Sequence, residues 1–179
     1  REEAGKALEK FREVCPDPVF AIGECMNGDP LELSLALLKY GFQVAEIYAT
    51  ITAENFVYLK QIEKLSPDTK VFSNMEPTML YYDPEKSGVT LTIGKDAGYY
   101  HQNCPNLLWN EDRQPYGYAG VRRLFEALRQ VVSGEQVLTG SQIQLGKQLV
   151  SEVKVAEIHG QSTDRFEADC IISERNRQE

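Results

Sequence analysis

The chain has 179 residues, enough for one ordinary domain with some extra length, and its 42% hydrophobic and 26% charged composition is typical of a folded globular protein. The formal net charge of −8 disfavours nucleic-acid and anionic-membrane partners, because contacts to phosphate need clustered lysine and arginine. No run of about 18 apolar residues occurs, so the sequence predicts no membrane-spanning segment.

The cysteines and the N-terminus limit the context further. Widely spaced cysteines without a Cys-x-x-Cys pair disfavour a zinc ribbon, a thioredoxin-like site and a disulfide framework, and a cytoplasmic location is expected. The first residues contain neither an initiator methionine nor an apolar signal region, and they resemble an amphipathic helix entered midway. We therefore expect the chain to be part of a longer protein.

The first part of the chain predicts a helix, a strand and a second helix. Apolar residues at helical spacing over residues 4–14 predict the first helix, which the prolines at 16 and 18 end. The short apolar run at 19–22 is typical of a parallel strand covered on both faces. A second helix is expected to begin at Asp29, with Pro30 in its first turn and Glu32 at capping-box spacing, and Gly41 is expected to form its left-handed C-cap.

The alternation continues to residue 132. Strands are expected over 44–51, 70–73, 89–93 and 106–109, with helices over 52–65, capped by Thr52, and over 121–132. Residues 75–87 are expected to be irregular, 95–101 to form one or two helical turns, and 110–118 to form a polar loop. This order predicts an α/β fold with a doubly wound, mostly parallel Rossmann-like sheet and helices on both faces.

The same pattern divides the chain into three parts. Residues 17–134 are expected to form the Rossmann-type domain, and residues 1–16 a linking helix from a preceding domain. Residues 135–179 are a C-terminal extension of uncertain structure, in which 145–158 fits either a strand pair or a helix.

Three loops that follow strands are the candidate binding region. Ligands of doubly wound sheets bind outside the carboxyl ends of the strands, so we expect a cofactor-binding site lined from these loops, with no metal ligand and no catalytic residue assigned. The candidates are Gly23, Glu24, Cys25, Asn27, Gly94, Lys95, Tyr99, His101, Asn110, Asp112, Tyr116 and Gly117.

Each loop also has a purely structural interpretation. The first lacks the Gly-x-Gly-x-x-Gly spacing, and Asp29 and Glu32 would repel a phosphate, so the structural interpretation, a well-capped turn, is favoured over a cofactor contact. His101 is one of two histidines and a candidate for acid–base chemistry or metal ligation, although a histidine beside tyrosines is more often a hydrogen-bonded surface residue. Gly117 and Gly120 are consistent with close backbone approach or with packing alone.

Four features nevertheless occur in one order: a Gly-Asp-Pro helix start, a leucine-rich helix followed by Tyr-Gly-Phe and a strand, an Ile-Gly before an aromatic-rich turn, and a Pro-Tyr-Gly-Tyr-x-Gly opening an amphipathic helix. They lie at residues 28–30, 31–44, 93–101 and 115–120. Over roughly residues 17–133 the sequence resembles the C-terminal domain of nitrogenase component 1-type oxidoreductases. The Gly-Tyr-x-Gly helix start is the most distinctive of the four features.

The resemblance implies a subunit of three such domains around a metallocluster or tetrapyrrole site. It implies as partners the other domains of the same subunit, a second component 1-type subunit and an ATP-dependent iron–sulfur reductase component. No cofactor is expected in the isolated domain, and an iron–sulfur or other metallocluster is expected in the full-length protein. In the catalytic nitrogenase subunit a histidine shortly before the Gly-x-x-Gly turn ligates the cofactor. The corresponding position falls at or near Leu107, and residues 102–120 contain no histidine, so a substrate other than dinitrogen is expected.

Two other functions stay open. The first is a Rossmann-like binding module for an anionic or sugar-like small molecule, with Lys95 and Arg113 as charge partners. The second is a non-catalytic assembly domain that pairs with another subunit.

Overall fold

The computed structural model describes residues 1–24, 28–73, 76–109 and 117–134. The chain divides into two compact units, residues 1–137 and 138–179, and all described residues belong to the first. The predicted extension at 135–179 lies outside the described residues. Among the residues described, no helix is long and apolar enough to cross a membrane.

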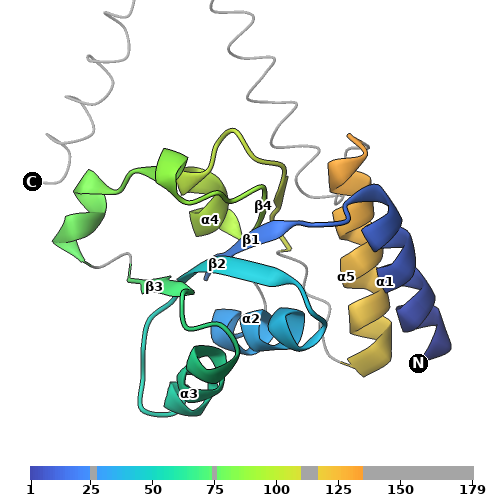
Figure 1. The fold of residues 1–179 in the computed structure, drawn as a ribbon, viewed down its shortest axis with the longest axis horizontal. Helices are drawn as coiled ribbons and strands as arrows, with labels where there is room; N and C mark the ends of the chain where they lie inside the picture. The colour runs from blue at the N-terminus through green and yellow to red at the C-terminus, as the bar shows by residue number, and fades with distance from the viewer. Residues whose placement is uncertain (25–27, 74–75, 110–116, 135–179) are drawn as a thin grey trace, which may run out of the picture. The chain divides into compact units, whose positions relative to one another are not determined.

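A five-stranded parallel sheet forms the centre of the first unit (Figure 1). Its strands are β1 (Val19–Ile22), β2 (Gln43–Tyr48), β3 (Lys70–Phe72), β4 (Leu91–Ile93) and β5 (Asn106–Leu107), in the order β3-β2-β1-β4-β5. All neighbouring pairs are parallel. The chain therefore runs outward from β1 first to one side and then to the other, which confirms the predicted doubly wound fold.

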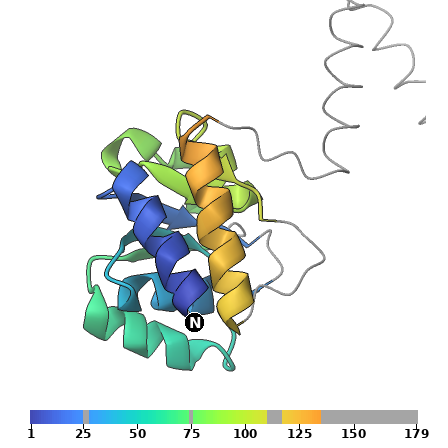
Figure 2. The same cartoon turned by 90° about the vertical axis from the view of Figure 1, so that its right-hand side faces the viewer.

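Helices cover both faces of this sheet. Helices α2 (Pro30–Lys39) and α3 (Phe56–Leu65) lie on one face, and α4 (Lys95–Tyr100) lies on the other (Figure 1). Helices α1 (Glu2–Val14) and α5 (Gly117–Val132) lie side by side (Figures 1 and 2). Two 3₁₀ turns, η1 (Pro77–Tyr81) and η2 (Pro84–Lys86), fall in the segment expected to be irregular.

Helix α1 is an integral part of the hydrophobic core. Phe11 is fully buried, and its ring lies 5.6 Å from that of Phe125 and 5.8 Å from that of Phe42. That this helix links to a preceding domain stays a prediction.

Both ends of α2 have the caps that the sequence predicts. Asp29 Oδ1 accepts hydrogen bonds from the backbone N–H groups of Leu31 and Glu32, at 2.7 and 3.2 Å. Gly41 has a φ of +81°, and the N–H groups of residues 41 and 42 donate to the carbonyls of residues 38 and 37. This is a Schellman motif, so the predicted caps of this helix are confirmed.

Several other boundaries were predicted wrongly. Helix α3 begins at Phe56, because Asn55 accepts from the Thr52 N–H and donates to the Thr50 carbonyl, which makes residues 50–55 a turn and excludes Thr52 as the cap. Helix α5 begins at Gly117 instead of residue 121, since the low helix propensity of glycine conceals its first turn. Strands β2, β3, β4 and β5 are shorter than expected. β5 ends at Leu107, and Trp109, expected to be its last residue, has a φ of +43°, which is incompatible with a strand.

A register shift divides β2 between the two faces of the sheet. Phe20 pairs with Val44, but Ala21 pairs with Glu46, so β2 accommodates one extra residue, Ala45. A shift of one residue turns the following side chains to the opposite face. Val44 therefore belongs to the large apolar cluster with Phe20, whereas Glu46 lies on the face of the smaller cluster of Ala21, Tyr48 and Ala97.

Candidate functional site

The carboxyl end of the sheet brings the loops after β1 and β4 into contact. Gly23 N donates to the carbonyl of Ile93 at 2.7 Å, and Gly94 N donates to that of Leu107 at 2.8 Å. A Cβ added to Gly94 would lie 2.9 Å from Gly23 O, and one added to Gly23 would lie 2.8 Å from Ala97 N. Both glycines are thus required for backbone-to-backbone packing at the point where the strand order reverses.

The other candidates have different environments. Lys95 is exposed at the start of α4, Tyr99 is 68% exposed, and Glu24 is partly buried. Gly117 is exposed at the first position of α5, with a φ of +69°. Cys25, Asn27, Asn110, Asp112 and Tyr116 lie outside the described residues. The structure therefore brings Gly23 and Gly94 together, with Lys95 next to Gly94 in sequence. The cofactor-binding role of every one of these candidates stays a prediction.

His101 lies in the interior and not on the surface, contrary to the commoner expectation for a histidine beside tyrosines. It is 4% exposed and lies against Glu46, which is 1% exposed. Its Nε2 is 2.9 Å from Glu46 Oε2, which is within the distance range of both a hydrogen bond and an ion pair. The carboxylate partner of His101 thus comes from the middle of β2, far away in the sequence.

Two tyrosines complete this buried cluster. Tyr48 and Tyr82 each donate a hydroxyl hydrogen bond to the same carboxylate oxygen, Glu46 Oε2, at 2.9 and 2.6 Å. The two hydroxyl oxygens also lie 3.3 and 3.2 Å from His101 Nε2. We call Glu46, Tyr48, Tyr82 and His101 the carboxylate cluster.

Three elements position the carboxylate cluster. The register shift in β2 places Glu46 and Tyr48 on one face, the connection after η1 supplies Tyr82, and His101 caps α4 through its N–H bond to the Ala97 carbonyl. Aromatic rings hold Tyr48 in place. It stacks on Tyr100 at 4.9 Å and on Phe72 at 5.6 Å.

The tyrosines of the cluster remain protonated over a wide pH range. Burial is the main cause that raises the pKa of Tyr48 far above its ordinary value, followed by its interactions with Tyr82 and Glu46. Burial and the hydrogen bond to Glu46 likewise raise the pKa of Tyr82. Both phenols therefore act as donors to the Glu46 carboxylate, which offsets the cost of burying its charge.

Sequence reasoning missed Glu46, Tyr48 and Tyr82. The available signal was a glutamate within the otherwise apolar strand Val44-Ala45-Glu46-Ile47-Tyr48, because an ionisable group in a buried parallel strand needs partners. Nothing in the spacing identified His101 as that partner, since 55 positions separate the two residues.

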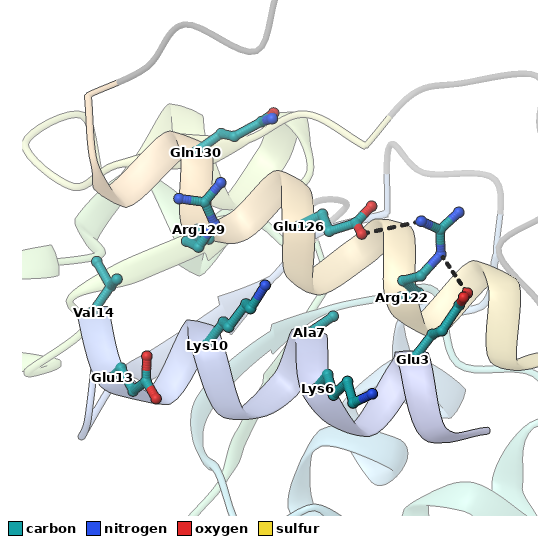
Figure 3. Close-up of a pocket in the computed structure, with 10 residues that line it drawn as sticks. All are labelled: Glu3, Lys6, Ala7, Lys10, Glu13, Val14, Arg122, Glu126, Arg129 and Gln130. Carbon is teal, nitrogen blue, oxygen red and sulfur yellow. Dashed lines mark hydrogen bonds and ion pairs between the residues drawn. The ribbon is translucent and has the colours of Figure 1, made fainter.

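The open cavities of this unit do not bring together side chains that point to one kind of ligand. One of about 710 Å³ lies between α1 and α5 (Figure 3). Its walls carry both signs of charge, and Arg122 pairs there with Glu126 at 3.2 Å and with Glu3 at 3.8 Å. A second hollow of about 180 Å³ lies between α2 and α5 and is mainly apolar, with Trp109 in its wall. Within the described ranges, no three His, Cys, Asp or Glu side chains are grouped to hold a metal ion.

Comparison with known proteins gives one clear result. No family model matches the sequence. No curated protein matches it. The solved structure of nitrogenase Cp1 at pH 6.5 superposes with a TM-score of 0.53 at 17% sequence identity, over 78% of this chain and 35% of that one. This chain thus spans about a third of the length of the nitrogenase chain, and the likeness shows that it has a nitrogenase-like α/β fold.

Proposed function

We propose that the chain is the C-terminal domain of a nitrogenase component 1-like oxidoreductase subunit. The full-length protein would carry out a metallocluster-dependent reduction, supplied with electrons by an ATP-dependent iron–sulfur reductase. The observation that carries the proposal is the similarity in fold to nitrogenase Cp1 over 78% of this chain. The Gly-Tyr-x-Gly sequence at the start of α5 agrees with it. The absence of a histidine from residues 102–120 favours a substrate other than dinitrogen.

Exposed apolar side chains on the surface of the unit favour contact with other protein surfaces. Large apolar side chains are exposed at Ile51 (43%), Phe56 (50%) and Val57 (54%), and Leu80 and Tyr81 are 85% and 88% exposed. Apolar groups gathered within a few residues favour burial against another protein surface. Other domains of the same subunit or a second component 1-type subunit would provide that surface.

The carboxyl end of the sheet would face the redox centre in this proposal. Gly23 and Gly94 allow close backbone packing there, and Lys95 provides an exposed positive charge suited to an anionic cluster or substrate. The domain supplies one wall of such a site and should be inert in isolation. The alternative is a Rossmann-like binding module for an anionic or sugar-like small molecule, with Lys95 as an exposed charge partner.

Analysis of acid-labile sulfide tests the proposal. The protein encoded by the complete reading frame would be purified without oxygen and compared with the 179-residue chain prepared in the same way. We expect iron and acid-labile sulfide in the full-length protein and no sulfide in the shorter chain. Full-length protein that folds but contains no sulfide under these conditions would contradict the proposal.

A further inference from the structure

The carboxylate cluster combines one carboxylate, two phenols and one imidazole. These side chains come from separate elements and approach one another in the interior of the unit, with Tyr48 fully buried and Glu46 and His101 nearly so. We propose that Glu46, Tyr48, Tyr82 and His101 form a binding site for a hard trivalent metal ion, namely mononuclear ferric iron. The inference does not depend on the proposed function above.

Four of the five distances among the donor atoms match the spacing of ligands around one ion, and the Glu46–Tyr82 distance is shorter. The distances from Glu46 Oε2 to the two tyrosine oxygens and to His101 Nε2 are 2.9, 2.6 and 2.9 Å. Nε2 lies 3.3 and 3.2 Å from the same tyrosine oxygens. Ligands held at about 2.0–2.2 Å from a metal lie roughly 2.8–3.6 Å apart at right-angle and tetrahedral geometry. Small outward movements of the four side chains would therefore admit an ion.

The charge of the cluster matches a trivalent ion. Two phenolates and one carboxylate carry three negative charges, and a neutral imidazole adds none. Binding would release the phenol protons of Tyr48 and Tyr82 to solvent, and His101 would bind through Nε2 with its proton on Nδ1. The resulting complex is neutral, which suits a buried position, whereas a divalent ion would be neutral only if one of the two phenols kept its proton.

The donor chemistry separates this site from an iron–sulfur cluster. It offers three oxygens and one nitrogen, and phenolate and carboxylate oxygens are hard ligands that prefer small, highly charged cations. Thiolate is absent from it: the described free cysteines, Cys15 and Cys104, are not members. Tyr82 is only partly buried, so its side of the cluster provides a route of entry and positions for water.

Titration with iron tests the inference directly. The 179-residue chain would receive ferric nitrilotriacetate, and we expect one ion per chain together with a visible phenolate-to-iron charge-transfer band. In Tyr82→Phe the band should fall to about half, and affinity should drop by more than about tenfold, the effect of losing even an outer-shell partner. Tyr81→Phe is the matched control, because Tyr81 is adjacent in sequence and 88% exposed, and it should bind like the parent.

Two results would overturn the inference. One is a folded parent chain that shows no band at one equivalent of iron. The other is an undiminished band in folded Tyr82→Phe, which would place the iron elsewhere. Gallium(III), a diamagnetic ion of equal charge, provides a test that needs no variant. Its NMR shifts should concentrate on the four cluster residues and spare Tyr81, and shifts elsewhere count against the site.

Discussion

Glu46 lies in the middle of β2, where its carboxylate is shielded from water. One of its oxygens accepts hydrogen bonds from Tyr48 and Tyr82 and lies at hydrogen-bond distance from His101. A buried carboxylate destabilises a fold unless such donors satisfy it. The cluster therefore connects β2, the segment after η1 and the end of α4.

Removing the Tyr82 hydroxyl shows how much the cluster contributes to the stability of the fold. Tyr82→Phe keeps the ring and deletes a donor to a charged acceptor, so the free energy of unfolding should fall by about 1–3 kcal/mol. Tyr81→Phe should change it by less than about 0.5 kcal/mol, because that side chain is exposed. Urea unfolding at neutral pH gives both values, and equal effects of the two substitutions would contradict the account.

The same tyrosines predict a dependence of stability on alkaline pH. The fold raises the pKa of Tyr48 and of Tyr82, so above about pH 10 the unfolded chain loses phenol protons that the folded chain keeps. The unfolded state then binds fewer protons, and the free energy of unfolding falls as pH rises. The limit is about 1.4 kcal/mol per pH unit for each tyrosine, less for Tyr82 because solvent screens a partly exposed group.

Unfolding measured between about pH 9 and 11 tests this dependence. Tyr82→Phe should lose part of the alkaline slope, and Tyr81→Phe should keep the slope of the parent. A slope that is the same in all three proteins would show that the cluster does not produce it.

The sequence identified one member of this cluster and missed its centre. His101 was a candidate because histidines are few in this chain, and its tyrosine neighbours were visible in the same segment. Glu46 is visible as an ionisable residue in an apolar strand, but its partner is not, because a register shift of β2 against β1 turns its side chain toward His101.

At the scale of elements, α4 packs closely on the ends of β1 and β4 because Gly23 and Gly94 have no side chains. Gly94 has a φ of +97° and contacts the backbone of Gly23, whereas Gly88 has a φ of +69° and no atom within 4 Å of an added Cβ. A positive φ alone costs an alanine about 1–2 kcal/mol, so Gly94→Ala should lower the free energy of unfolding by more than this amount. Gly88→Ala isolates that conformational cost.

A third substitution completes this series. Gly5 lies inside α1 with open space around it, so Gly5→Ala should stabilise the chain by about 0.5–1 kcal/mol. Thermal or urea unfolding of the three variants gives the order. A loss in Gly94→Ala no larger than in Gly88→Ala would show that the contact with Gly23 is not tight.

Element boundaries were predictable where a local signal sets them. Asp29 and Gly41 are local caps, and both ends of α2 agree with the prediction. The start of α3 was missed because Asn55 bonds to residues 50 and 52 and competes with the expected cap. The length of β5 was overestimated because Trp109, two residues after the strand, has a left-handed backbone conformation that its residue type does not predict.

At the scale of the molecule, α1 and α5 bring the first and last described segments together. Phe11 is fully buried, whereas Phe56, on α3, is 50% exposed. Phe11→Ala should cost about 3–5 kcal/mol of unfolding free energy, and Phe56→Ala should cost much less because little burial is lost. Chemical denaturation compares them, and a small effect of Phe11→Ala would mean that α1 is not required for the folded unit.

The overall fold was predictable because alternation of strands and helices is repeated along the chain and fixes a parallel, doubly wound sheet. Function was not predictable to the same depth. A fold supports many activities, and chemistry depends on residues that the sheet brings together from distant parts of the chain, such as Glu46 and His101.

The central claim, a domain of a nitrogenase component 1-like oxidoreductase, is tested most directly by electron transfer. The full-length protein, purified without oxygen, would be mixed with a reduced ATP-dependent iron–sulfur reductase, and oxidation of the reductase cluster would be followed by its absorbance. We predict oxidation that requires both ATP and the full-length protein. Cluster oxidation that proceeds equally without either one, or no oxidation with both present, would contradict the claim.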